Sequence, residues 1–277
     1  MAETTRIEWT DATWNPWSGC TRVSPGCDHC YAESLSKRFG RDFSTLRRAS
    51  NATFYAPHKW KAPRKIFTCS MSDFFHRDAA PWLPQAWDLM RLATRHTFQV
   101  LTKRPGRAAA WWEHWRHDVN PADTPFVEWP AHIWLGTSVE TQKYAPRVDV
   151  LARVPAPVRF VSAEPLLGPL DLTHYLDRPH TCICTKPDGP HSIDCLADTK
   201  TSWVIIGGES GPGARPMDLD WALSLVSQCR AAGIPVFVKQ LGAAWARKNK
   251  AGDHKGGNPA EWPSALRIRQ FPLGAAK

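Results

Sequence analysis

Six short apolar runs recur along the chain, each rich in β-branched and aromatic residues and each ending in polar side chains. They cover residues 65–73, 97–105, 133–140, 158–168, 203–211 and 234–242. Near-continuous apolar strands that alternate with helices are typical of a parallel sheet covered by helices, so we expect an α/β fold. The number of units favours a partial or complete (β/α) TIM-like barrel. A doubly wound open sheet is the alternative, because periodicity does not show whether a sheet closes.

The segment between the last two runs shows the helical pattern most clearly. Apolar side chains recur there every three or four residues and mark one face, made of Leu219, Ala222, Leu223, Val226 and Cys229. Asp218 is suited to cap the start of this helix, and Gly233 is suited to end it. The same face predicts that Cys229 packs inside the protein.

The composition is that of a globular protein with a basic balance. Its 277 residues are 43% hydrophobic, so we expect a single barrel-like domain over residues 1–277. The net charge of +9 favours an anionic partner such as DNA, RNA or a nucleotide, although a solvated basic surface would give the same value. No stretch contains the about 18 apolar residues of a membrane span, and the segment MAETTRIEW lacks the apolar core of a signal peptide. We therefore expect a cytoplasmic protein with no membrane partner.

The chain contains 15 tryptophans, which have two uses in a protein of this charge. Exposed indoles can stack on nucleic-acid bases. Most are better explained as core, since Trp87 lies at helical spacing from Leu83 and Met90.

Polar and charged residues follow the apolar runs directly. They include Ser70, Ser72 and Asp73; Thr102, Lys103 and Arg104; Ser138 and Glu140; Ser162 and Glu164; Glu209 and Ser210; and Lys239 and Gln240. In (β/α) barrels the working groups lie at the carboxyl ends of the strands. Five or six charged tips in succession therefore predict one shared pocket.

Cys20, Cys27 and Cys30 lie within eleven positions near the N-terminus, in the stretch WSGCTRVSPGCDHCYAE. The preceding residues supply a short first strand, so these thiols belong to the first loop at the same end of the sheet, and a helix should begin near Tyr31. Zinc would need Asp28 or His29 as a fourth ligand, at a spacing too tight for easy convergence. Three thiolates can instead hold three irons of a [4Fe–4S] cluster and leave the fourth iron open.

The cysteine loop resembles the cluster loop of radical S-adenosylmethionine enzymes, with the spacing C-x6-C-x2-C in place of their usual C-x3-C-x2-C. The whole chain more closely resembles a phage-associated family of unknown function whose members are described as three-Cys-motif proteins. The segments that carry this second resemblance are IEWTDATWNPWSGCTRVSPGCDHCYAE, SMSDFFH, LTKRP, FVSAEPLLGPLDL, WVIIGGESGPGARPM, VFVKQLG and EWPSALRIRQFP. They span nearly the full chain.

The radical-enzyme resemblance implies both cofactors and residue roles. The three cysteines would bind the cluster, and the amino and carboxylate groups of S-adenosylmethionine would bind its fourth iron. With an electron from a reductant, the sulfonium would split into methionine and a 5′-deoxyadenosyl radical that removes a hydrogen atom from the substrate. The expected cofactor-binding residues are His29, Tyr31, Ser70, Ser72, Asp73, Ser138, Glu140 and Glu209.

Within that set, His29 stands where the superfamily often has an aromatic residue near the adenine. Ser70, Ser72 and Asp73 match in position a segment that contacts the cofactor's amino group, although the usual Gly-Gly-Glu is absent. The expected catalytic residues are Lys103, Glu164 and Lys239. The two lysines, with Arg104, would suit a phosphate or carboxylate. Cys69 is a further candidate, as a hydrogen donor near the pocket mouth.

A second cysteine group lies in a polar segment, residues 174–201, which interrupts the apolar pattern and is therefore expected to be an inserted Cys/His-rich loop. Its candidate zinc ligands are Cys182, Cys184, His191 and Cys195, with His180 as the alternative to His191. A second iron–sulfur cluster, or a loop with incidental thiols, are the alternatives.

Two functions follow from these observations. The first is a radical S-adenosylmethionine enzyme that modifies or repairs a nucleotide or nucleic acid. The second is a non-catalytic protein in which zinc at both cysteine groups shapes a basic, tryptophan-rich surface for DNA or RNA. Iron and sulfide content distinguishes them.

Overall fold

A seven-stranded parallel sheet forms the centre of the protein in the computed structural model, which describes residues 3–119, 128–176 and 201–272. Its strands are β1 (Ala12–Trp14), β4 (Lys65–Thr68), β5 (Thr97–Thr102), β6 (Ile133–Ser138), β7 (Arg159–Ala163), β8 (Trp203–Gly207) and β9 (Val236–Gln240). All six strands expected from the apolar runs are present, and the short first strand precedes the cysteine loop as predicted.

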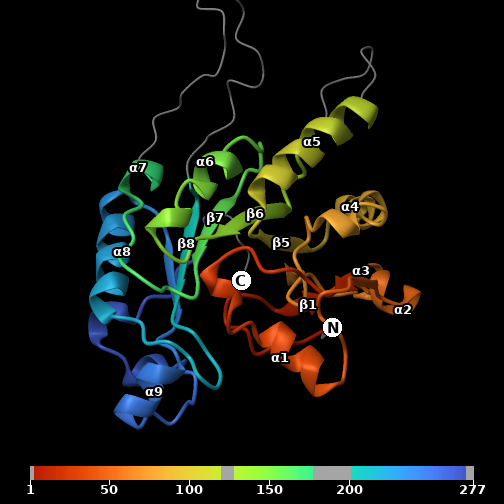
Figure 1. Cartoon of the computed structure of the whole chain (residues 1–277). Coiled ribbons are helices and arrows are strands. Elements are labelled where there is room, and N and C mark those ends of the chain that lie inside the picture. The colour runs from red at the N-terminus through yellow and green to blue at the C-terminus, as the bar shows by residue number, and fades with distance from the viewer. Residues whose placement is uncertain (1–2, 120–127, 177–200, 273–277) are drawn as a thin grey trace, which may run out of the picture.

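The strands lie side by side in chain order, and every neighbouring pair is parallel. A doubly wound sheet reverses its strand order at a switch point, and this sheet does not. It curls into a half-barrel with β1 and β9 at its two edges (Figure 1). The expectation of a partial (β/α) barrel is therefore confirmed, and the doubly wound alternative is wrong.

Helices connect the strands. They are α1 (Tyr31–Arg38), α2 (Asn51–Phe54), α3 (Ala56–Lys59), α4 (Leu83–Leu92), α5 (Pro105–Val119), α6 (Arg147–Leu151), α7 (Thr173–Leu176), α8 (Leu219–Ala231) and α9 (Ala243–Asn249). Short 3₁₀ turns are η1 (Pro25–Cys27), η2 (Arg77–Ala79), η3 (Gln142–Tyr144), η5 (Pro259–Glu261) and η6 (Ser264–Leu266).

The ends of α8 follow the sequence prediction. The Asp218 carboxylate accepts a hydrogen bond from the backbone N–H of Asp220 at 2.9 Å and so caps the first turn. At the other end Gly233 has a φ of +68°, a backbone conformation that favours glycine. This turn lets the Ile234 N–H reach the Cys229 carbonyl at 2.8 Å, which ends the helix.

A small antiparallel ribbon, β2 (Trp17–Ser18) with β3 (Arg47–Arg48), was not predicted from the sequence. It brackets residues 19–46, which contain the cysteine loop and α1. Gly19 follows β2 with a φ of +97°, and a Cβ there would lie 2.3 Å from the Thr45 carbonyl oxygen. Only glycine therefore fits where the chain leaves the ribbon and enters the cysteine loop.

The core alternates across the sheet as strand geometry requires. On β4 the Ile66 side chain packs with the outer helices, and on β5 the same is true of Phe98, whereas Phe67 and Leu101 turn to the concave side. A mainly aromatic cluster packs on the concave side and consists of Trp9, Trp134, Phe160, Trp203, Ile205 and Phe237.

The tryptophans are core residues, as predicted. Eleven are buried, and the other four, Trp82, Trp111, Trp221 and Trp245, are partly buried. None is in the exposed class, so the tryptophans offer little surface for stacking on bases.

The predicted insertion is described only at its two ends. Residues 174–176 belong to α7, and buried Thr201 donates a hydrogen bond to the Tyr175 carbonyl at 3.3 Å. Cys182, Cys184, His191 and Cys195 lie outside the described residues. Among the helices that the structure describes, none combines the length and apolar character needed to cross a bilayer.

Candidate functional site

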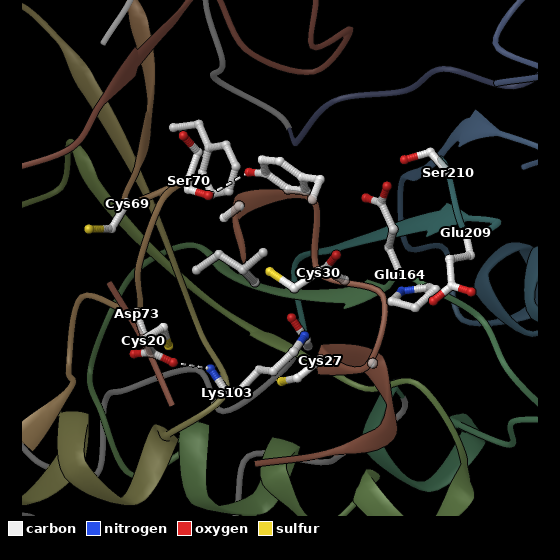
Figure 2. Close-up of a pocket in the computed structure, with 18 of the residues that line it drawn as sticks. Cys20, Cys27, Cys30, Cys69, Ser70, Asp73, Lys103, Glu164, Glu209 and Ser210 are labelled. Carbon is white, nitrogen blue, oxygen red and sulfur yellow. Dashed lines mark hydrogen bonds between the residues drawn. The ribbon is translucent and has the colours of Figure 1, made fainter. Parts of the chain in front are cut away.

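A cavity of about 390 Å³ opens at the carboxyl ends of the strands, where the polar tips predicted a pocket. Apolar side chains of the concave face, among them Trp9, Phe67 and Leu101, line part of it. Polar groups from the strand ends and all three cysteines of the N-terminal loop line the rest. In Figure 2, Cys27 and Cys30 lie between Cys20 on one side and Glu164 and Glu209 on the other.

The three thiols of the cysteine loop are accessible. Cys20, Cys27 and Cys30 are all free and partly exposed, and α1 begins directly after Cys30, as predicted. Burial, with the nearby Asp73 carboxylate, raises the pKa of Cys20, while the Arg104 guanidinium, 3.7 Å from its sulfur, opposes that rise. The loop therefore presents three unpaired sulfur ligands to one cavity.

Asp73, which follows β4, anchors the start of the cysteine loop through Arg104. Its carboxylate accepts hydrogen bonds from the Thr102 hydroxyl at 2.7 Å and the Lys103 N–H at 2.9 Å, and it pairs with Arg104 at 3.0 Å. Arg104 in turn donates to the Thr21 carbonyl at 2.8 Å. The predicted cofactor contact Asp73 lines the cavity, but its oxygens are already engaged by the protein.

Glu140, which follows β6, anchors the middle of the loop. It is fully buried, accepts the Ser24 hydroxyl at 2.7 Å, and pairs with Lys103 at 2.9 Å and Arg147 at 3.0 Å. Burial opposes its ionisation, but Lys103, Ser24 and Arg147 together lower the pKa of Glu140. Gly26 packs so closely on it that a Cβ would lie 2.5 Å from Oε1.

Lys103 and Glu140 were predicted to act on substrate and cofactor. The structure pairs them with each other beneath the loop. Glu140 is absent from the cavity lining, whereas Lys103 contributes to it.

Glu209, which follows β8, anchors the end of the loop. It lies 2.9 Å from Nδ1 of His29 and binds the Arg215 guanidinium at 2.6 Å. Arg215 also donates to the Pro25 carbonyl at 2.8 Å and pairs with Asp28 at 3.5 Å. Burial disfavours the charged form, but Arg215 and His29 lower the pKa of Glu209.

Glu164 and Lys239 form an ion pair with each other at the cavity. They come from the ends of β7 and β9 and both line the cavity, with side chains 19% and 17% exposed. The pair thus has access to a bound molecule. Ser138, Ser162 and Ser210 line the cavity from the neighbouring strand ends.

The segment after β4 faces the cavity from the other side. Asn15 donates to the Ser70 hydroxyl at 3.1 Å, and the Tyr31 hydroxyl donates to the Ser70 carbonyl at 2.6 Å. The Ser72 hydroxyl binds the Gly19 carbonyl. Predicted cofactor contacts Tyr31, Ser70 and Ser72 are therefore brought together at the cavity, next to the start of the cysteine loop.

The two remaining described cysteines differ. Cys69 lines the cavity, as expected, but is 3% exposed with a φ of +127°, and burial raises its thiol pKa well above the ordinary value. Cys229, on the inner face of α8, is fully buried in the core, as predicted, and burial raises its pKa to about 12.

The metal ion or cluster that the site could bind depends on how its donor side chains are arranged. Within the described ranges, no three His, Cys, Asp or Glu side chains converge closely enough to hold a single ion. A [4Fe–4S] cluster differs from a single ion because each thiolate binds a different corner iron. Three free thiols of one loop line the same cavity, and they are the donor atoms that such a cluster would require.

Several positioning residues were missed by sequence reasoning. Ser24 and Gly26 lie between the cysteines, and only their small size could have indicated that they pack against another element. Arg147, on α6, gave no signal at all. The N-terminal residues Arg6 and Glu8, and Lys255, also line the cavity, although they follow none of the predicted strands.

The chain belongs to the family described as protein of unknown function (DUF5131), whose model matches residues 4–263. No curated protein and no solved structure matches the chain.

Proposed function

We propose that this protein is a radical S-adenosylmethionine enzyme that acts on a nucleotide or nucleic-acid substrate. The observation that carries the proposal is the placement of three free, partly exposed thiols of one loop in a cavity at the carboxyl end of a parallel half-barrel. Cys20, Cys27 and Cys30 would hold a [4Fe–4S] cluster. A cluster bound there with S-adenosylmethionine would supply the one-electron reduction by which the sulfonium is split into methionine and a hydrogen-abstracting 5′-deoxyadenosyl radical.

The chain's own residues would hold the loop in one geometry. Each of three carboxylates fixes a different part of the loop from a different strand end. Asp73 acts through Arg104, Glu140 through Ser24, and Glu209 through its separate contacts with His29 and Arg215. Ligands that are held in place before the metal binds lose less entropy on binding. The three carboxylates therefore act as positioning residues.

The cavity's lining suits a ligand with an apolar face and polar edges. Trp9, Phe67 and Leu101 provide the apolar surface. Hydroxyl groups from Ser70 and Ser210 stand at the polar side. A nucleoside has both characters.

Glu164 and Lys239 are the proposed catalytic pair. Both reach the cavity and retain partial exposure, so either can contact a substrate and move a proton to or from it. Lys239, with Lys255 and Arg6 in the same lining, also adds positive charge suited to phosphate. The net charge of +9 supports an anionic substrate. The resemblance to a phage-associated family favours a reaction that modifies or repairs nucleic acid.

A cysteine variant tests the proposal. Protein reconstituted with iron and sulfide without oxygen is compared with Cys27→Ala, and with Cys229→Ala as a matched control whose thiol lies in the core away from the cavity. We expect wild type and the control to cleave S-adenosylmethionine under dithionite. Cys27→Ala should lose cluster absorbance and cleavage while its circular dichroism spectrum persists.

Cleavage at the wild-type rate by Cys27→Ala would overturn the ligand assignment. Wild-type protein that takes up only zinc, and cleaves nothing, would favour the zinc-binding alternative with DNA or RNA.

A further inference from the structure

The lysines and arginines that line the cavity differ in whether the protein already neutralises them. Lys103, Arg104 and Lys239 each form an ion pair with a carboxylate that follows a strand. Arg6 and Lys255 line the same cavity, and the described part of the chain gives neither side chain a hydrogen bond or an ion pair. Their charge is therefore available to an anionic group of a bound molecule.

This available charge lies at the outer part of the cavity. The Lys239 side chain is 17% exposed and is held by Glu164, whereas Lys255 is half-buried and Arg6 is exposed. Glu8 also lines the cavity, so the cations without a partner outnumber it by two to one. The apolar part of the lining comes from the concave face of the sheet. A nucleotide would therefore place its base against the apolar interior and its phosphate at the mouth.

A run of basic residues continues from the cavity mouth along α9. Residues 243–257 contain Arg247, Lys248, Lys250 and Lys255, which together form the α9 strip, and one carboxylate, Asp253. That carboxylate is engaged by two backbone N–H groups at 2.7 and 3.2 Å. Arg247, Lys248 and Lys250 are exposed, and Arg247 donates to a backbone carbonyl at 3.5 Å. The strip thus carries positive charge that the segment itself does not balance.

The lack of acidic neighbours distinguishes α9 from other surface helices. On α1 and α4, Lys37 and Arg91 each pair with an acidic residue three or four positions earlier. The helix α9 contains no acidic residue. Its dipole favours cations in the last turn, which is a structural reason for Arg247 and Lys248. It gives no such reason for Lys255, which lies beside the other end of the helix.

The strip leads away from the cavity mouth. The Lys255 carbonyl accepts a hydrogen bond from the Gly242 N–H at 2.9 Å, which places it beside the start of α9. Lys250 follows the last residue of α9, whose seven residues span about 10 Å. That distance equals about three nucleotides of a stacked strand. Figure 1 shows α9 at the lower edge of the view, as it does α1, which follows the cysteine loop.

We propose that Arg6 and the α9 strip bind the phosphates of a single-stranded nucleic acid from which one nucleotide enters the cavity. Arg6 and Lys255 would bind the phosphate of the entering nucleotide, and Arg247, Lys248 and Lys250 those that follow it. Enzymes that act on a base take it out of the stack, and an unpaired strand lowers the cost of that step. The proposal rests on the proposed function for its chemistry, and it specifies a strand rather than a free nucleotide.

Two other anionic occupants fit the strip less well. A free nucleotide at the mouth would leave the far end of the strip, about 10 Å away, without a ligand. An acidic protein would need apolar contacts at the centre of its interface. Of the five large hydrophobic side chains exposed in the described part of the chain, none lies within residues 243–257. Phosphate contacts need no apolar surface, so these features favour a strand.

Strand binding is measured on the reconstituted full chain without a reductant, so that no turnover occurs. The probes are a fluorescein-labelled, mixed-sequence DNA strand of about 15 nucleotides, its RNA counterpart, and the nucleoside 5′-monophosphates. The strip variant is Lys248→Gln/Lys250→Gln. Its matched control is Lys59→Gln/Lys61→Gln, which removes the same charge from two exposed lysines that precede β4, at the amino end of the sheet.

For the strip variant we expect the dissociation constant of the strand to rise about tenfold at about 0.1 M salt. The slope of log affinity against log salt should fall by about 1.4, because two phosphate contacts are lost. Binding of the monophosphates should not change. A third variant, Lys255→Gln, should weaken both the strand and the monophosphates, because it removes a cation from the mouth. The control should match wild type with every probe.

A difference between the strip variant and its control supports the proposal and identifies the strand as DNA or RNA. Equal dissociation constants and salt slopes with both strands would overturn it. So would a polyglutamate peptide that binds wild type as tightly as the strand does, or monophosphates that bind equally tightly. Strip-dependent binding by protein that does not cleave S-adenosylmethionine with dithionite would refute the proposed reaction and support the strand site.

Discussion

The carboxylates that follow β4, β6 and β8 differ from the one that follows β7 in what they contact. Asp73, Glu140 and Glu209 all hold the cysteine loop, directly or through an arginine, and each is almost completely buried. Glu164 pairs with Lys239, and both side chains keep partial access to the cavity. Asp73 and Glu209 also line the cavity, but their oxygens are engaged by residues that hold the loop. Charged residues that look alike in the sequence thus have two roles, one in holding the loop and one in facing the cavity with partial exposure.

This division has a simple geometric cause. Parallel strands in chain order bring all their carboxyl ends to one edge, so a loop that crosses that edge meets several strand ends at once. The cysteine loop passes over three of them. Carboxylates beneath it become buried and must find cationic or hydrogen-bonding partners, whereas a carboxylate beside it stays available.

The largest expected difference between the two classes is in stability. Glu140→Gln removes the charge that balances Lys103 and Arg147, so we expect a loss of about 3 kcal/mol in the free energy of unfolding. Glu164→Gln breaks a partly exposed pair and should lose about 1 kcal/mol. Urea unfolding of the two variants measures both values.

The two variants should also differ in iron content and in turnover of substrate. Glu164→Gln is expected to keep wild-type iron content and lose turnover of substrate, whereas Glu140→Gln should lose iron. Equal stability losses in the two variants, with equal iron contents, would remove the distinction between loop-building and cavity-facing carboxylates.

A smaller effect is expected from the contact between the loop and Glu140. A Cβ in Gly26→Ala would lie 2.5 Å from Glu140 Oε1 and 2.6 Å from its Cγ, so a neighbour must shift, at a cost of about 2 kcal/mol. Gly106→Ala is the matched control, because its Cβ would meet nothing closer than Val150 Cγ1 at 3.8 Å. Thermal unfolding should show Gly26→Ala well below wild type and Gly106→Ala close to it. A similar melting temperature for both would mean that the loop does not press on Glu140.

The difference in unfolding free energy between wild type and Glu140→Gln should change gradually with pH. The pKa of Glu140 is lowered in the folded protein, so its charge stabilises the fold above the ordinary value of 4.5, and that stabilisation is lost as pH falls through the lowered value. The stability gap between wild type and Glu140→Gln should therefore be constant near neutral pH and shrink below about 4.5. Urea unfolding at several pH values measures the gap. A gap that widened on acidification would contradict the charged role of Glu140.

The fold could be predicted largely because its strands are buried on both faces. Such strands are near-continuous apolar runs, as in residues 133–138 and 203–207, and their direction follows from the helices between them. The extent of closure could not be predicted. Closure depends on whether the two edge strands of the sheet meet, and no local sequence pattern indicates this. The β2–β3 ribbon was missed because each strand is only two residues long.

The location of the candidate site could be predicted from the sequence, but the contacts among its residues could not. The three cysteines and most strand-tip residues do line one cavity, since topology alone brings them together. The role of Glu140 depends on Ser24, which lies 116 residues away in the chain. A contact over that distance leaves no periodicity in the sequence, so a carboxylate beneath the loop could not be told from one facing the cavity.

The most direct test of the account is the metal content of wild-type protein reconstituted without oxygen. The proposed three-thiolate cluster predicts about four iron and four sulfide per chain, with a visible spectrum that changes when S-adenosylmethionine is added. Protein that binds one zinc per chain, with no sulfide and no response to S-adenosylmethionine, would contradict it.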